Sequence, residues 1–184
     1  MKRYLITSHE FYGRDPDAFS DILRKQLDKH RPHYVLYRDK DNVRYEDQAR
    51  DFINVCSQHK DVKSFIHQNV DLAKELDAAG VHLTSAQFDK IEYAKSSGLE
   101  VIISTHSHKE ALQAQKLGAD AITYSPIFAS PGKGDPKGIE ELERLLSICD
   151  INVFALGGIV TKEHVDIIEK TKAFGFASIR YFFN

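Results

Sequence analysis

Short apolar runs alternate along the whole chain with longer segments in which apolar residues recur at helical spacing. A continuous apolar run of about four to eight residues is typical of a buried strand, and a repeat every three or four residues is typical of one helix face. The runs predict strands at residues 3–7, 33–37, 62–67, 80–83, 100–104, 121–125, 151–156 and 173–179.

The segments between these runs carry helix signals. Asp15 followed by Pro16 is typical of a helix start, where an N-cap precedes a residue that needs no N–H partner. Ser107 and Glu110 fit a capping box at the start of a later helix. The buried stripes of the first two helices are predicted at Phe19, Ile22, Leu23 and Leu27, and at Tyr45, Ala49, Phe52, Ile53 and Cys56.

Strands that alternate with helices indicate a parallel sheet covered by helices, because parallel strands need crossover connections. Eight such units favour an α/β fold of the TIM type, a closed (β/α)8 barrel. An open doubly wound sheet is the alternative, but the segment after the first strand, "TSHEFYGRD", lacks its G-x-G-x-x-G turn. We expect a single domain over residues 1–184, in a short barrel that lacks the eighth outer helix.

A barrel without that helix leaves apolar surface between its first and seventh helices. One way to cover this surface is a homodimer. The alternative is that Phe182 and Phe183 fold back against the first helix. The sequence leaves both open.

Composition and charge limit the classes of partner. With 42% hydrophobic residues the chain has enough apolar side chains for its own core, and a formal charge of −2 gives no overall attraction to nucleic acid or to anionic membranes. The N-terminal stretch "MKRYLIT" is too short for a signal peptide or a membrane span, so we expect a cytoplasmic protein. Cys56 and Cys149 have neither metal-site nor disulfide spacing and are expected to be packing residues.

Polar residues follow the predicted strands, and in such barrels the functional site lies at the carboxyl ends of the strands. Gly157 and Gly158, just before a helix predicted to start near Thr161, suggest a phosphate-binding turn. Basic residues from separate loops suggest a phosphorylated or diphosphorylated small ligand, unless they pair with acids such as Asp39 or Asp135. The candidate residues are Tyr37, Arg38, Lys40, His67, Gln68, Ser104, His106, Ser130, Lys133, Gly157, Gly158 and Arg180.

Several motifs, in order, resemble those of thiamine phosphate synthase and its TenI-type thiazole tautomerase relatives. They are "YLIT", "YRDK", "AAGVHL", "ISTHS", "LGADAITYSPIFASPGKG" and "ALGGI", and together they cover nearly the whole chain. The resemblance implies a role in thiamine biosynthesis. The synthases join hydroxymethylpyrimidine diphosphate to thiazole phosphate and release diphosphate with the help of magnesium.

The resemblance also implies roles for individual residues. Arg38 and Lys40 match the family's diphosphate-contacting basic pair, and Ser104 matches a serine near the diphosphate. Lys133 matches the lysine of a phosphate-covering loop at residues 125–138. Gly157 and Gly158 match the turn that holds the thiazole phosphate, and Tyr37 is interpreted as the residue in place of a family Gln.

Departures from the family pattern affect the expected metal and the expected acid or base. Gln68 stands in place of one aspartate that binds metal in the family, and the second such aspartate falls at about Gln87. Because neutral amides replace two carboxylates, we expect magnesium to bind weakly. The tautomerases carry a histidine where this chain has Pro126, and His67 is a candidate replacement as general acid or base. Arg180 stands about where the family has a small serine.

Three functional hypotheses remain from the sequence. The first is a thiamine-biosynthetic enzyme, either a synthase or a thiazole tautomerase. The second is a non-catalytic binder or sensor of thiazole or pyrimidine phosphates, which the missing carboxylates suggest. The third is a zinc-dependent hydrolase built on His67, His82 and His106.

Overall fold

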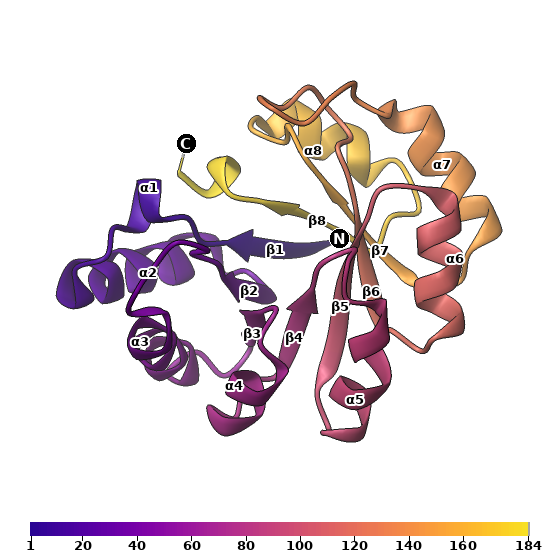
Figure 1. Ribbon diagram of the computed structural model, residues 1–184. Helices are drawn as coiled ribbons and strands as arrows, with labels where there is room; N and C mark the ends of the chain where they lie inside the picture. The colour runs from indigo at the N-terminus through magenta and orange to yellow at the C-terminus, as the bar shows by residue number, and fades with distance from the viewer. Residues whose placement is uncertain (184) are drawn as a thin grey trace.

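The computed structural model describes residues 1–183 and contains a closed barrel of eight parallel strands in sequential order. Each strand pairs with its neighbours along the chain, and β8 pairs with β1 to close the barrel. Figure 1 shows the helices arranged around the outside of these strands. The strands are β1 (Lys2–Ile6), β2 (Tyr34–Tyr37), β3 (Lys63–His67), β4 (Gly80–Leu83), β5 (Glu100–Thr105), β6 (Ala121–Tyr124), β7 (Asn152–Leu156) and β8 (Gly175–Ser178).

The helices lie in the connections between successive strands, as the alternating pattern predicts. They are α1 (His9–Tyr12), α2 (Pro16–His30), α3 (Tyr45–Ser57), α4 (Val70–Glu75), α5 (Ile91–Ser96), α6 (His108–Lys116), α7 (Gly138–Ile148) and α8 (Lys162–Glu169), with short 3-10 helices η1 (Phe88–Lys90) and η2 (Arg180–Phe183). None of the helices in residues 1–183 is long and apolar enough to cross a membrane.

The predicted helix starts are present with side-chain caps. The Asp15 carboxylate accepts a hydrogen bond from Ala18 N at 2.9 Å, directly before Pro16 at the start of α2. Ser107 Oγ accepts from the N–H of Glu110 at 3.2 Å, whereas the Glu110 carboxylate accepts from the N–H of His106 rather than from the cap residue. The capping box is therefore shifted by one residue at its second bond.

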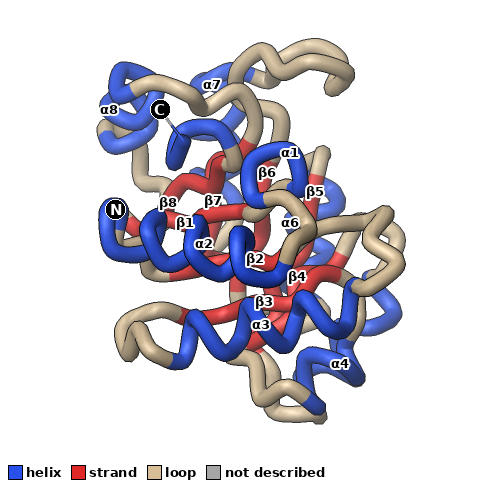
Figure 2. Tube along the Cα trace, turned by 90° about the vertical axis from the view of Figure 1, so that its left-hand side faces the viewer, coloured by secondary structure: helices blue, strands red, loops and turns tan. Residues whose placement is uncertain are grey.

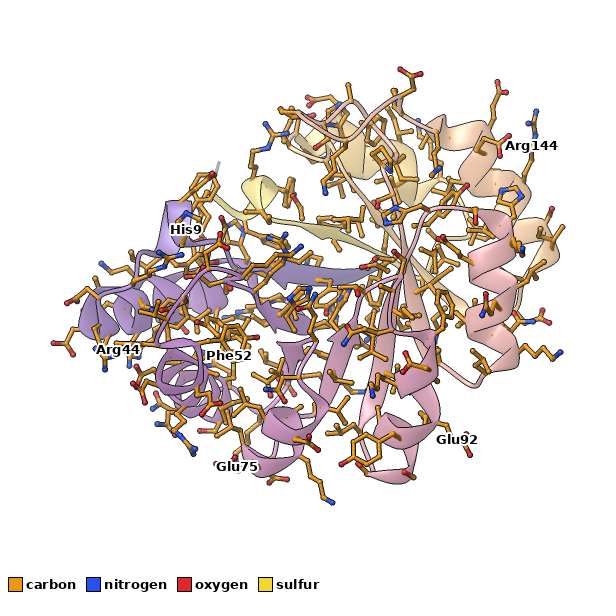
Figure 3. The ribbon with its side chains drawn as sticks, in the orientation of Figure 1. His9, Arg44, Phe52, Glu75, Glu92 and Arg144 are labelled. Atoms are coloured by element: carbon orange, nitrogen blue, oxygen red, sulfur yellow. The ribbon has the colours of Figure 1, made fainter. Side chains whose placement is uncertain are left out.

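Alternation along the strands divides the core into two clusters. One fills the inside of the barrel and contains Tyr4, Ile6, Tyr34, Leu36, Phe65, Ile102, Ala121, Phe154 and Ala177. The intervening strand residues pack with the helices in a second, larger cluster, to which Phe52 on the inner side of α3 belongs. Figure 3 shows Glu75, Glu92 and Arg144 on the outer sides of α4, α5 and α7, so charged side chains face away from the barrel.

Two glycines allow aromatic rings to fill the inside of the barrel. A Cβ at Gly80 would lie 2.3 Å from the Phe65 ring, and a Cβ at Gly175 would lie 2.7 Å from the Phe154 ring. Any larger residue would collide with these rings, which also contact Tyr4. The aromatic packing closes the amino-terminal part of the barrel and leaves the polar residues at the carboxyl ends of the strands.

After β8 the described residues form the 3-10 helix η2. Phe182 is fully buried and stacks on Phe176, and the ring of His30 in α2 meets it edge-on. Phe183 contacts Phe11 and Tyr12, and Figure 1 shows this end of the chain beside α1. The two phenylalanines thus fold back against the first helices, while the homodimer stays a prediction.

Candidate functional site

The end of β2 shows which side chains reach the mouth of the barrel. Leu36 lies in the inner cluster, and Tyr37 lies in the outer cluster, where its hydroxyl donates to Gln48 of α3 at 3.0 Å. Tyr37 therefore packs between barrel and helix and does not face a ligand. The predicted ligand contact of Tyr37 is therefore not found, because successive side chains along a strand face opposite sides of the sheet and Tyr37 faces the helix layer.

Arg38 and two histidines lie near one another at the mouth. The Arg38 N–H donates to Thr7 Oγ1 at 2.9 Å, which fixes the start of the loop after β2. The pKa of His67 is lowered to about 3 by burial and by the nearby His82, Arg38 and Lys40, and the pKa of His82 is lowered to about 3 by burial and Arg38. His67 is therefore a neutral hydrogen-bonding group at pH 7, not a histidine poised to titrate there.

A hydrogen-bonded chain crosses the inside of the barrel to Ser104. The Tyr4 hydroxyl lies 2.8 Å from His82 Nδ1, and His82 Nε2 lies 3.0 Å from Ser104 Oγ. Burial raises the pKa of Tyr4, so its hydroxyl stays protonated and is able to donate to Nδ1. In the tautomer that accepts this bond, the neutral imidazole donates from Nε2 to Ser104, which leaves the Ser104 hydroxyl proton available for an anionic ligand.

A pocket of about 430 Å³ opens beside His67, between the loops that follow β2, β3 and β4. This volume lies in the range of small-molecule sites. Lys40 and His67 line it, in agreement with their predicted place at the mouth. Its lining is Asp39, Lys40, Tyr45, His67, Gln68, Asn69, Val70, Asp71, Gln87, Lys90 and Tyr93.

Asp39 is buried at the pocket wall, but its charge is already matched. Both of its carboxylate oxygens accept from the Arg14 guanidinium at 2.8 Å, and His9 Nδ1 at the start of α1 lies 3.7 Å away (Figure 3). The hydrogen bonds from Arg14 hold the pKa of Asp39 below its ordinary value. Among residues 1–183 neither Arg38 nor Lys40 forms an ion pair, so both remain available for a ligand.

The two glycines after β7 form the base on which the β6–α7 loop rests. Gly157 and Gly158 have φ angles of 97° and 69°, in the left-handed region that favours glycine. A Cβ on Gly157 would lie 2.8 Å from Pro126, and a Cβ on Gly158 would lie 2.5 Å from Ala129 O. Phe128 N donates to Gly157 O at 3.0 Å, so this turn also holds the loop in place.

Several predicted site residues are not part of the lining of this pocket. Lys133 and Arg180 are exposed, and no ion pair ties either of them down in the part of the chain that the structure describes. Figure 2 shows the β6–α7 loop, which carries Ser130 and Lys133, projecting from the barrel. His106 is exposed and lies 3.2 Å from Ser125 O at the base of that loop.

A family model described as "Thiamine monophosphate synthase" matches residues 3–182 of this chain. The chain belongs to this family. A protein of Aquifex aeolicus (strain VF5), which carries the provisional name thiamine-phosphate synthase 2, is 33% identical over 184 residues, or 97% of this chain and 96% of that protein. A thiamine-phosphate synthase of Caldivirga maquilingensis is 35% identical over 136 residues, or 72% of this chain and 65% of that protein.

Solved structures agree with the family and the fold. The thiamine phosphate pyrophosphorylase from Pyrococcus furiosus superposes with a TM-score of 0.80 at 27% identity, over 97% of this chain and 85% of that one. A structure described as native KDPGal gives a TM-score of 0.74 at 17% identity, which shows a shared barrel fold alone. The chain is thus a thiamine phosphate synthase-like TIM barrel, and its family supports a role in thiamine biosynthesis.

The residues of this chain do not fit the family's magnesium ion. Gln87 Oε1 already accepts from Thr84 N at 3.1 Å and from Thr84 Oγ1 at 3.3 Å, so its oxygen is committed within its own loop. Asp39 is bound by Arg14, and Asp71 accepts from Tyr93 at 2.6 Å. Magnesium prefers anionic oxygen ligands, and the pocket offers no free pair of them.

The zinc hypothesis is also not supported by the geometry. His82 uses one ring nitrogen toward Tyr4 and the other toward Ser104, so neither is free to bind a metal. No group of three or more His, Cys, Asp or Glu residues within residues 1–183 could hold a metal ion. His67 and His106 alone are too few ligands for a zinc site.

Sequence reasoning missed four residues that shape the site: Tyr4, Arg14, Lys90 and Tyr93. Tyr4 lies in an apolar strand. A buried tyrosine hydroxyl needs a hydrogen-bond partner, so a tyrosine at an inward-facing position could have indicated a polar contact inside the barrel. Lys90 and Tyr93 follow β4 by several residues, in η1 and α5, so a search restricted to strand ends does not reach them.

Proposed function

We propose that this chain joins hydroxymethylpyrimidine diphosphate to thiazole phosphate, as the synthases of its family do, with little dependence on magnesium. The observation that carries the proposal is that Arg38 and Lys40 lie near His67 and form no ion pair among the described residues, while Ser104 is hydrogen-bonded to the neighbouring His82. Arg38, Lys40 and Ser104 occupy the motif positions that the resemblance links to the diphosphate.

The chemistry needs stabilisation of a departing anion. When the bond to diphosphate breaks, diphosphate leaves with the electron pair, and negative charge develops on its oxygens. Arg38 and Lys40 supply positive charge, and the Ser104 hydroxyl supplies a proton donor that is oriented through His82 and Tyr4. In the proposed reaction Lys133 and the β6–α7 loop close over the bound phosphates, and the turn at Gly157 and Gly158 receives the thiazole phosphate.

The proposal is tested by a turnover assay for thiamine phosphate with both substrates, in chelator, in magnesium and in manganese. We expect product in all three conditions, and we expect Arg38→Gln and Lys133→Ala to reduce its rate strongly. Lys116→Ala, an exposed lysine in the last turn of α6, is the control and should leave the rate unchanged. Absence of product in every condition would overturn the proposal.

A non-catalytic binder is the second candidate, and the commitment of Gln87 within the loops is the observation that favours it. A site without metal ligands can hold phosphates without accelerating their departure. Calorimetric titration of each substrate separates the two candidates, since a binder gives saturable heat for the phosphates but no thiamine phosphate.

A further inference from the structure

The side chain of Gln87 links two loops at the place where the family resemblance puts a metal ion. Its Oε1 accepts from Thr84 in its own loop, and its Nε2 donates to Gln68 O at 3.2 Å in the loop after β3. Gln68 is itself held by a hydrogen bond from its N–H to His82 O at 2.9 Å, with a φ of 66°. A neutral amide thus fixes the relation of these two loops without a cation.

The same pocket carries positive charge on its walls. Lys40 comes from the loop after β2 and Lys90 from η1 after β4, so the two ammonium groups enter from different loops. Among the described residues the ion-pair partner of Lys90 is its neighbour Asp89, at 3.6 Å. Both side chains are more than half exposed, so the pair holds the lysine weakly. Asp71 is the remaining carboxylate of the pocket, and it is engaged by Tyr93.

We propose that this pocket binds diphosphate directly between the ammonium groups of Lys40 and Lys90, with no metal ion, and that Lys90 supplies the charge that the metal would supply. The identity of the anion as diphosphate rests on the proposed function. The role of Lys90 rests on its place in the pocket lining and on the Gln87 amide, whose oxygen and nitrogen are both hydrogen-bonded within the loops. It also rests on the absence of a free pair of carboxylates among the described residues that line the pocket. An ammonium is a suitable substitute because it binds phosphate oxygens as a point charge.

Calorimetric titration of the full chain with inorganic diphosphate tests the inference. We expect binding in a chelating buffer, and no tighter binding when magnesium is added. Lys90→Gln should weaken the affinity about 10- to 100-fold, the loss typical of one charge-assisted contact, whereas Lys116→Gln should not change it. Binding that requires magnesium, unchanged affinity in Lys90→Gln, or no binding in either buffer would overturn the inference.

A gain-of-function variant gives a second test that does not depend on loss of binding. Replacing both amides, as Gln68→Asp with Gln87→Asp, places two carboxylates at the predicted metal positions and should make diphosphate binding magnesium-dependent. If this variant does not fold, the Lys90→Gln titration still decides. Diphosphate binding without thiamine phosphate formation would refute the synthase proposal alone, and product formed in chelator together with unchanged diphosphate affinity in Lys90→Gln would refute this inference alone.

Discussion

Acid should destabilise this protein well above the pH at which carboxylates titrate, because His67 and His82 are buried as neutral imidazoles. Their pKa values are lowered from 6.5 to about 3 in the folded protein. Between pH 3 and pH 6.5 the unfolded chain therefore binds more protons than the folded one. The free energy of unfolding is then highest above pH 6.5 and falls as the pH drops toward 3.

The size of the effect follows from the two pKa values of each histidine. At pH 5 an unfolded histidine with a pKa of 6.5 is almost fully protonated, whereas the folded one is neutral. Relative to pH 7, each of the two histidines therefore lowers the free energy of unfolding by about 2 kcal/mol. Both groups together give about 4 kcal/mol between pH 7 and pH 5. His30 and His33, whose pKa values are also lowered, add a background that variants of His67 share.

Urea unfolding at pH 7, 6 and 5 measures this dependence. We expect His67→Gln to lose about 2 kcal/mol less than the natural chain over this range, because one of the two buried histidines no longer contributes. His106→Gln, which changes an exposed histidine at the same mouth, should keep the full dependence. A natural chain with constant stability from pH 5 to 7, or equal slopes for His67→Gln and His106→Gln, would refute the reasoning.

Three further substitutions probe the parts that hold the site. Asp39→Asn should lower the unfolding free energy by about 1–3 kcal/mol at pH 7, because it removes the charged acceptor of the hydrogen bonds from Arg14. This difference from the natural chain should vanish as the pH falls below the lowered pKa of Asp39. A difference that persists below that pH in urea titrations would argue against the role given to the Arg14–Asp39 pair. Gly158→Ala should destabilise the protein more than Gly132→Ala in thermal unfolding. Both glycines have a φ of 69°, but only a Cβ at Gly158 would collide with backbone atoms of the β6–α7 loop. Equal losses of stability would contradict this expectation. Phe182→Ala should cost about 3–5 kcal/mol in urea unfolding, as a fully buried ring is removed, and a loss under 1 kcal/mol would mean that η2 does not cover the barrel.

The fold could be predicted from sequence because its determinants are local. Every predicted strand overlaps an observed one, since a buried parallel strand is a continuous apolar run with polar residues at its ends. The start of α2 could be placed at Asp15 and Pro16 because a cap depends on neighbouring residues alone. The position of Phe182 and Phe183 could not be decided, since it depends on which distant surface they meet.

The site could be predicted only as a set of rim residues. Arg38, Lys40 and His67 come together because strand ends of a barrel share one mouth. Tyr37 was misplaced because side chains alternate along a strand, so a shift of one residue exchanges mouth and helix layer. The role of Gln87 depends on loop geometry, and the pairing of Arg14 with Asp39 joins residues 25 positions apart, which no local pattern reveals.

Transfer of the pyrimidine unit by this chain can be measured in a single-turnover experiment. Enzyme in excess over hydroxymethylpyrimidine diphosphate is mixed with thiazole phosphate in chelating buffer, quenched at intervals and analysed for thiamine phosphate and diphosphate. We expect both products to appear together, in equal amounts, until the pyrimidine substrate is consumed. Recovery of both substrates intact, from enzyme shown by calorimetry to bind them, would contradict it.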